Sequence, residues 1–153
     1  MTYVIGKDDL RDGQVVSLLH EHYLDMLTKS PIESVHALTA DDIKQSGVEF
    51  WSVRAGNQVV ACCGLNVFSK GHAELKSMKT SQAHTKKGLA AKLLAYVLHE
   101  AKGQGIEQVS LETGSQVSFL PAKRLYQKFG FHQTQPFGDY TDDPNSYFMT
   151  KTL

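Results

Sequence analysis

The stretch 81–91, SQAHTKKGLAA, runs directly into the apolar sequence KLLAYVLHEAKG. A helix start carries unpaired backbone N–H groups and about half a unit of positive charge, so it can bind an anion. Gly88 lets a ligand approach the backbone because it has no Cβ, and Ala90 keeps the next turn slim. Lys86 and Lys87 add positive charge. These residues suit a phosphate or pyrophosphate, although a solvated basic turn before a core helix would have the same composition.

The Walker spacing GxxxxGK[ST] and the dinucleotide fingerprint GxGxxG are both absent from this stretch. The helix that follows is amphipathic, which indicates that one of its faces packs on a sheet. Its apolar positions are Leu89, Leu93, Val97 and Ala101, with Ala90, Leu94 and Leu98 beside them.

Hydrophobic periodicity predicts the elements that hold this unit. Strands are expected at 2–6, on both sides of a Gly56-Asn57 turn within 48–68, and at 71–81, 107–113, 131–137 and 146–153. Helices are expected at 8–29, 88–102 and 118–130, with a short one near 40–45. This order predicts an α+β or mixed α/β sheet with helices on both faces, in a single domain covering residues 1–153.

Composition excludes several classes of protein. Lys plus Arg and Asp plus Glu both number 16, so the formal net charge is zero, which counts against nucleic-acid binding over the whole surface. No apolar run reaches the length of a signal peptide or a membrane span, so we expect a cytoplasmic protein with no membrane partner. The adjacent Cys62 and Cys63 would point to opposite faces of a strand, which predicts buried, reduced thiols. No zinc spacing occurs, and we expect no metal.

A second motif lies downstream, PAKRLYQKFGF at 121–131. Together the two stretches resemble the GNAT acetyltransferase superfamily, whose signatures are Q/R-x-x-G-x-G/A and A-x-x-L-Y-x-K-x-G-F. The first signature falls on Thr85–Ala90 and the second on Ala122–Phe131, in the family's order and with a strand between them. The resemblance covers about residues 48–153 and is closest to small bacterial single-domain members.

Two positions depart from the family pattern. Thr85 replaces the usual Gln or Arg, which removes one side-chain contact to the pyrophosphate. Phe119 stands where many members carry an Asn that contacts the cofactor arm. Ala90 in place of the last glycine is a variation that the family permits.

The resemblance implies a central, mostly antiparallel twisted sheet with helices on both faces, whose fourth and fifth strands splay apart. Acetyl-CoA, the implied co-substrate, would lie in the gap between those strands. Backbone groups of Met78 and Thr80 would contact the pantetheine arm, and the N–H groups of Thr85–Ala90 would hold the pyrophosphate. The implied cofactor-binding residues are Met78, Lys79, Thr80, Thr85, Lys86, Lys87, Gly88, Leu89, Ala90, Thr113, Phe119, Ala122 and Tyr126.

The implied activity is N-acetyl transfer to an amine by direct attack in a ternary complex. An amine with a pKa of about 10 is mostly protonated at neutral pH, and the departing thiolate benefits from a proton donor. Tyr126 matches the family tyrosine near the thioester sulfur and is the candidate acid, although it could equally be an aromatic anchor. Glu74 is the first candidate base or a carboxylate paired with Lys76, and Glu112 and Asp139 are the second and third.

The acceptor side is expected in the variable loops SPIESVHAL and GDYTDDPNS, with Ser34, His36 and Tyr140 as candidate contacts or plain loop residues. The acceptor itself, a small molecule or a peptide, is left open, as is a homodimer. A competing hypothesis is a non-catalytic acyl-CoA sensor, favoured by the departures at Thr85 and Phe119. A nucleic-acid module built on the lysines of 76–87 is the weakest alternative, because the net charge is zero.

Overall fold

A seven-stranded sheet forms the centre of the computed structural model, which describes residues 2–34, 43 and 47–153. In the order in which they lie side by side, the strands are β1 (Tyr3–Asp8), β2 (Glu49–Ala55), β3 (Gln58–Ser69), β4 (His72–Thr80), β5 (Gln108–Gly114), β7 (Ser146–Thr152) and β6 (His132–Gln133). Each neighbouring pair is antiparallel except β4 and β5, which run parallel. The expected mixed, mostly antiparallel sheet is confirmed.

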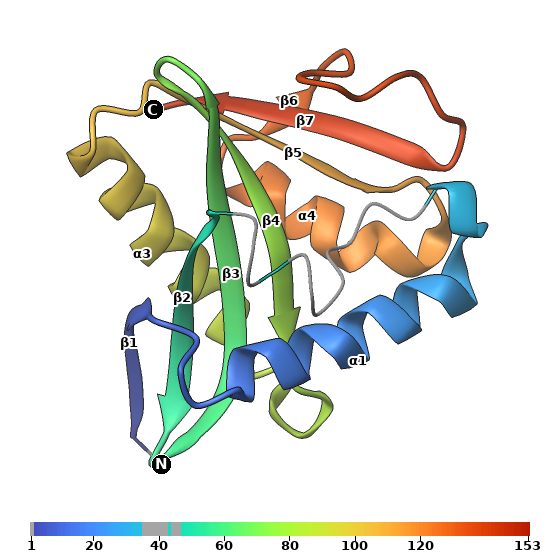
Figure 1. The fold of residues 1–153 in the computed structure, drawn as a ribbon. Helices are drawn as coiled ribbons and strands as arrows, with labels where there is room; N and C mark the ends of the chain where they lie inside the picture. Colours follow the sequence, from blue (N-terminus) through green and yellow to red (C-terminus); the bar gives the residue numbers. More distant parts are fainter. Residues whose placement is uncertain (1, 35–42, 44–46) are drawn as a thin grey trace.

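Helices cover both faces of this sheet (Figure 1). Helix α1 (Gln14–Lys29) lies on one face, and α3 (Leu89–Gly103) and α4 (Leu120–Lys128) lie on the other. Among the described residues, the short 3-10 helices are η1 (Ile32–Ser34), η2 (Gln82–His84) and η3 (Val117–Phe119). The two faces are called the α1 face and the α3 face below.

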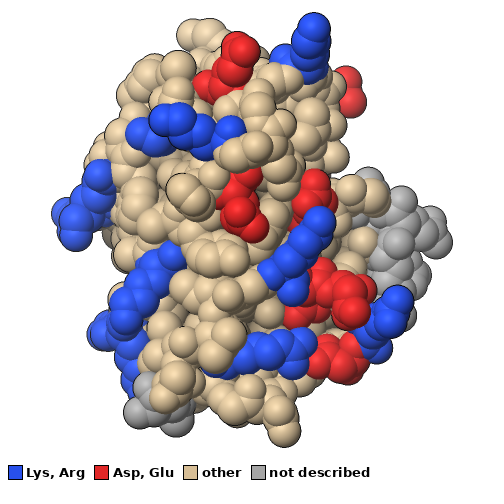
Figure 2. All heavy atoms as spheres, turned by 90° about the vertical axis from the view of Figure 1, so that its left-hand side faces the viewer, with Lys and Arg blue, Asp and Glu red and all other residues tan. Residues whose placement is uncertain are grey.

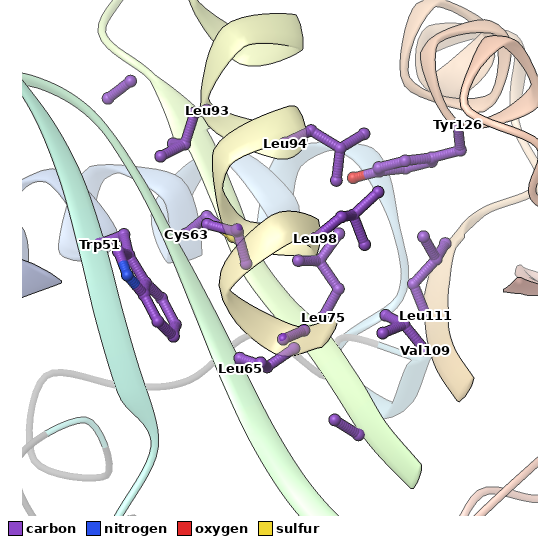
Figure 3. Packing of buried hydrophobic residues seen from close by; sticks show 14 of the residues in the cluster. Trp51, Cys63, Leu65, Leu75, Leu93, Leu94, Leu98, Val109, Leu111 and Tyr126 are labelled. Carbon is purple, nitrogen blue, oxygen red and sulfur yellow. The ribbon is translucent and has the colours of Figure 1, made fainter. Parts of the chain in front are cut away.

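Each face has its own apolar core. Cys62 packs with Val15 and Leu19 of α1, whereas Cys63 packs with Leu93 and Leu94 of α3 (Figure 3). Side chains of neighbouring strand residues point to opposite faces, so the two adjacent cysteines serve two cores. Both thiols are free and buried, as the sequence predicts.

Helix α3 confirms the predicted amphipathic pattern. Its buried residues are Leu89, Leu93, Leu94, Val97, Leu98 and Ala101. Each fully buried leucine contributes roughly 1.5–3 kcal/mol of transfer free energy, so this face holds the helix firmly on the sheet. The loop that precedes α3 is therefore fixed at one end of β4.

The sheet opens between β4 and β5. The two strands pair only from His72–Glu74 to Gln108–Ser110, and beyond that each follows its other neighbour. A register shift in β3 between Cys62 and Gly64 accompanies the opening, and Ser77 of β4 has a φ of 58°. A positive φ is uncommon for a residue other than glycine and bends the strand locally. The expected splay of the fourth and fifth strands is thus present.

Two predicted elements have the wrong bounds. The expected helix 8–29 begins only at Gln14, because Asp8 belongs to β1, where Arg54 and Ser52 donate to its carboxylate, and Gly13 has a φ of 76°. The expected strand 131–137 is reduced to the two residues of β6, because Pro136 has no N–H to continue the ladder. The expected short helix near 40–45 lies outside the described residues, apart from Ile43.

Candidate active site

A cavity of about 450 Å³ occupies the opening between β4 and β5. Its walls come from α1, from the second half of β4, from the end of β5, and from η3 and α4, with Tyr140 and Asn145 from the loop before β7. The cavity therefore runs from the start of α3 to side chains on both faces of the sheet. No described helix is long and apolar enough to cross a membrane.

The start of α3 is open towards solvent. Gly88 is its N-cap residue with a φ of 76°, and no side chain caps the helix. The first helical hydrogen bond runs from Lys92 N–H to the Gly88 carbonyl at 3.1 Å, so the N–H groups of 89–91 have no carbonyl within the helix to bind. A Cβ at Gly88 would meet no atom within 4 Å, so its positive φ, rather than crowding within the chain, favours glycine here.

The other predicted cofactor residues are divided between this helix start and the cavity. Lys86 and Lys87 are exposed, the Thr85 hydroxyl donates to the Gln82 carbonyl at 3.1 Å, and Leu89 is buried in the core with only its backbone at the helix start. The predicted residues that line the cavity are Met78, Lys79, Thr80, Thr85, Ala90, Thr113, Phe119, Ala122 and Tyr126.

Tyr126 of α4 reaches the cavity from the α3 face. Its ring is 7% exposed, contacts Phe131 edge-on at 5.8 Å between centroids, and points from α4 towards Leu94 (Figure 3). Burial raises the pKa of the Tyr126 phenol well above its ordinary value, with smaller contributions from Cys63 and Glu112. The phenol therefore keeps its proton at neutral pH and is available as a donor.

Glu74 lines the cavity from the α1 face. The Tyr140 hydroxyl donates to Glu74 Oε2 at 2.5 Å, and Lys76 Nζ lies 3.4 Å from both that oxygen and the Tyr140 oxygen. Both sequence-based interpretations of Glu74 describe part of this arrangement, since it faces the cavity and also pairs with Lys76. Burial and the charge of Glu74 raise the pKa of the Tyr140 phenol, which keeps it a hydrogen-bond donor.

Glu112 lies on the same face at the end of β5. Burial raises the pKa of its carboxyl to about 7, and the charge of Glu74 adds to the rise. Asp139, in contrast, is exposed and does not line the cavity. Ser34 ends η1, and His36 lies outside the described residues.

Several residues of the site were missed by sequence reasoning. Helix α1 contributes His22, Asp25 and Lys29 to the cavity wall. Gly114 ends β5 where any Cβ would overlap the Phe119 ring, so only glycine fits against it. Ser77 marks the bend in β4. A glycine at the end of an expected strand could have indicated the close contact at Gly114. The contacts of α1 with the cavity depend on tertiary packing and have no signal in the local sequence.

Charges of both signs are interspersed on the face of the molecule shown in Figure 2. This face therefore lacks the continuous basic surface that nucleic-acid binding usually requires. Within the described ranges, no group of three or more His, Cys, Asp or Glu residues is arranged to hold a metal ion.

Comparison with known proteins identifies the family. The model of the acetyltransferase (GNAT) family matches residues 15–131. The chain is 47% identical to the uncharacterised N-acetyltransferase YsnE of Bacillus subtilis, over 95% of this chain and 97% of that protein. It is 38% identical to the uncharacterised N-acetyltransferase YedL of Escherichia coli, over 99% of this chain and 95% of that protein.

Solved structures share the fold. The PaiA N-acetyltransferase of Thermoplasma acidophilum in complex with coenzyme A superposes with a TM-score of 0.77, at 18% identity and over the full length of both chains. A GNAT family acetyltransferase of Elizabethkingia anophelis with acetyl-CoA bound gives a TM-score of 0.73, at 17% identity, over 99% of this chain and 98% of that chain. With the splayed sheet, the open helix start and these matches, the chain belongs to the acetyltransferase (GNAT) family and is an acyltransferase.

Proposed function

We propose that this protein transfers the acetyl group of acetyl-CoA to an amine by direct attack in a ternary complex. The observation that carries the proposal is the cavity between β4 and β5, which joins an open helix start to a buried phenol, a buried carboxyl group and a partly buried one. The solved relatives with coenzyme A or acetyl-CoA bound support the choice of co-substrate.

The co-substrate would enter from the α3 face. The N–H groups of Thr85–Ala90 would hold the pyrophosphate, which needs backbone and small residues rather than particular side chains. The backbone at Met78 and Thr80, next to the bend at Ser77, would contact the pantetheine arm. The thioester would then lie in the opening of the sheet, where groups on both faces can reach it.

The amine would attack from the α1 face. Its nitrogen forms a bond to the thioester carbon, the carbon–sulfur bond breaks, and the departing thiolate takes a proton from Tyr126. The amine must lose a proton before or during this attack. Glu74 and Glu112 are the two carboxyl groups on this face, and we assign them different parts. Glu74, held by Tyr140 and Lys76, polarises the site, whereas Glu112, whose carboxyl has a pKa raised to about 7, accepts the proton.

Calorimetry with acetyl-CoA tests where the co-substrate binds. A glutamate at Gly88 should repel the pyrophosphate, so Gly88→Glu should abolish micromolar binding. Gly88→Ala is the matched control, because it meets the same positive φ without adding a charge and should weaken binding much less.

Two results would contradict the proposal. Absence of binding to folded wild type would remove the co-substrate site from this helix start. Binding without amine-dependent release of coenzyme A, over a broad panel of amines, would favour a non-catalytic acyl-CoA sensor.

A further inference from the structure

The charged side chains that line the cavity form two groups whose net charges have opposite signs. Near α1, Asp25 pairs with Lys29 at 2.9 Å and with Lys79 at 3.9 Å, so two cations share one carboxylate. Near β5, Lys76 pairs with Glu74 at 3.4 Å, and no described cation forms an ion pair with Glu112. The first group therefore carries one positive charge in excess, and the second carries one negative charge in excess when Glu112 is ionised.

His22 belongs to the positive group. Its Nδ1 is buried and has no hydrogen-bond partner among the described residues, although His22 lines the cavity. Burial, together with the charge of Lys79, lowers the pKa of His22 to about 4, so the ring is neutral at physiological pH. A neutral imidazole has one N–H donor and one acceptor, so the ring can donate a hydrogen bond to an anion that occupies the cavity.

The positive group lies on the α1 face of the sheet, from which the acceptor amine is proposed to attack. Lys79 reaches across to Asp25 of α1, whereas its neighbour Met78 packs in the core of the α3 face. The N–H groups proposed to hold the pyrophosphate belong to the start of α3, on the opposite face. An anion bound between Lys79, Lys29 and His22 would therefore belong to the acceptor rather than to coenzyme A.

We propose that the acceptor is an amino acid, whose amine lies at the Glu74–Glu112 end of the cavity and whose carboxylate is bound by Lys79, Lys29 and His22. This inference rests on the proposed acetyl transfer and narrows its substrate class. The two groups complement a zwitterion. The carboxylate of the acceptor would lie against the excess positive charge near α1, and its amine would lie against the excess negative charge near β5. A simple cationic amine would leave the excess positive charge of Lys29 and Lys79 uncompensated.

Matched pairs of acceptors test the proposal. Free L-amino acids and their carboxamides differ only in the charge of the carboxyl end, and each is assayed at saturating acetyl-CoA by release of the coenzyme A thiol. For the best amino acid we expect a kcat/KM at least 10-fold above that of its carboxamide. Lys79→Met should lower kcat/KM for the amino acid at least 10-fold, through KM, and change the value for the carboxamide less than 2-fold.

Two further variants complete the experiment. Lys29→Met carries the same expectation, so the test survives if Lys79→Met does not fold. Lys102→Met is the control, because Lys102 is exposed in the last turn of α3. This substitution should leave kcat/KM unchanged for both the amino acid and its carboxamide.

Three outcomes would overturn the inference. Equal kcat/KM values for amino acids and carboxamides would show that the carboxylate is not recognised, while acetyl transfer itself would stand. A rise in KM for acetyl-CoA alone in Lys79→Met would assign the positive group to a phosphate of the co-substrate. Acetyl-CoA binding without turnover of any amino acid would reject this acceptor class. Absence of acetyl-CoA binding to the wild-type protein would instead reject the proposed function.

Discussion

At the scale of single residues, the proton chemistry depends on how burial separates the pKa values of the site. The carboxyl of Glu112 has a pKa of about 7 because its charged form is poorly solvated, and the Tyr126 phenol has a raised pKa for the same reason. A carboxyl group that ionises near neutral pH can accept a proton, and a phenol that stays protonated can donate one. Burial thus leaves one group able to ionise near neutral pH and keeps the other protonated.

The pH dependence of kcat should reveal which carboxylate accepts the proton. Glu112 must be ionised to act as base, so kcat should fall as pH drops below about 7 and level off above it. Glu112→Gln should remove this limb and lower kcat by about 100-fold or more. Glu74→Gln removes a neighbouring negative charge, which lowers the pKa of Glu112 and moves the limb to lower pH. Steady-state rates between pH 5 and 9 would measure both effects.

Tyr126→Phe provides the contrast for this experiment. Removal of the phenol should lower kcat at every pH without moving the limb, because the Tyr126 pKa lies far above the range measured. Retention of the limb in Glu112→Gln, together with its loss in Glu74→Gln, would instead identify Glu74 as the base.

At the scale of elements, the junction between β5 and η3 shapes the cavity wall. Gly114 ends β5, and the Phe119 ring of η3 packs against it so closely that a Cβ would overlap the ring. Phe119 is 8% exposed, and Lys29 Nζ lies 5.9 Å from its centroid. The absence of a side chain at Gly114 therefore fixes the position of the Phe119 ring in the cavity wall.

Gly114→Ala should displace the Phe119 ring into the cavity. We expect a loss of roughly 1–3 kcal/mol in the free energy of unfolding, which is typical of an overpacked site, and weaker acetyl-CoA binding. Denaturant melts and calorimetry would measure the two quantities. Gly103→Ala is the matched control, because a Cβ there meets no atom within 4 Å at the end of α3, and it should leave both unchanged or slightly improved. Equal effects of the two substitutions would show that the contact with Phe119 is unimportant.

At the scale of the whole molecule, the opening between β4 and β5 divides the sheet into two parts. The strands from β1 to β4 form one part and β5, β7 and β6 form the other, joined by three residue pairs between β4 and β5. A ligand that fills the opening would contact both parts at once, so it should stabilise the folded state as a unit.

Acetyl-CoA should therefore raise the melting temperature. A ligand at 100 times its Kd stabilises the folded state by about 2.7 kcal/mol, which corresponds to roughly 5–10 °C for a chain of this length. Differential scanning fluorimetry over a range of acetyl-CoA concentrations would measure the shift, and Gly88→Glu should show little or none. A shift of the same size in Gly88→Glu would mean that acetyl-CoA binds elsewhere.

The sequence by itself determined the features that depend on local periodicity and backbone chemistry. The amphipathic α3, its open N-terminus at Gly88, the paired strands around Gly56-Asn57 and the opposed cysteines all follow from residues close together in the chain. Short-range patterns report such elements well, because hydrophobic spacing and glycine act within one or two turns. The family resemblance added the splay of β4 and β5, and it is the source of the proposed acid role of Tyr126.

Only the tertiary structure decided which distant residues meet. Tyr140 donates to Glu74 across 66 positions of sequence, and Lys79 reaches Asp25 from a different element. Burial then separates the pKa of Glu112 from that of an ordinary carboxyl, which no local pattern reports. Contacts and solvation depend on how the helices pack on the sheet, so the charged side chains of the cavity come together only when α1 and the loop before β7 pack against β4 and β5.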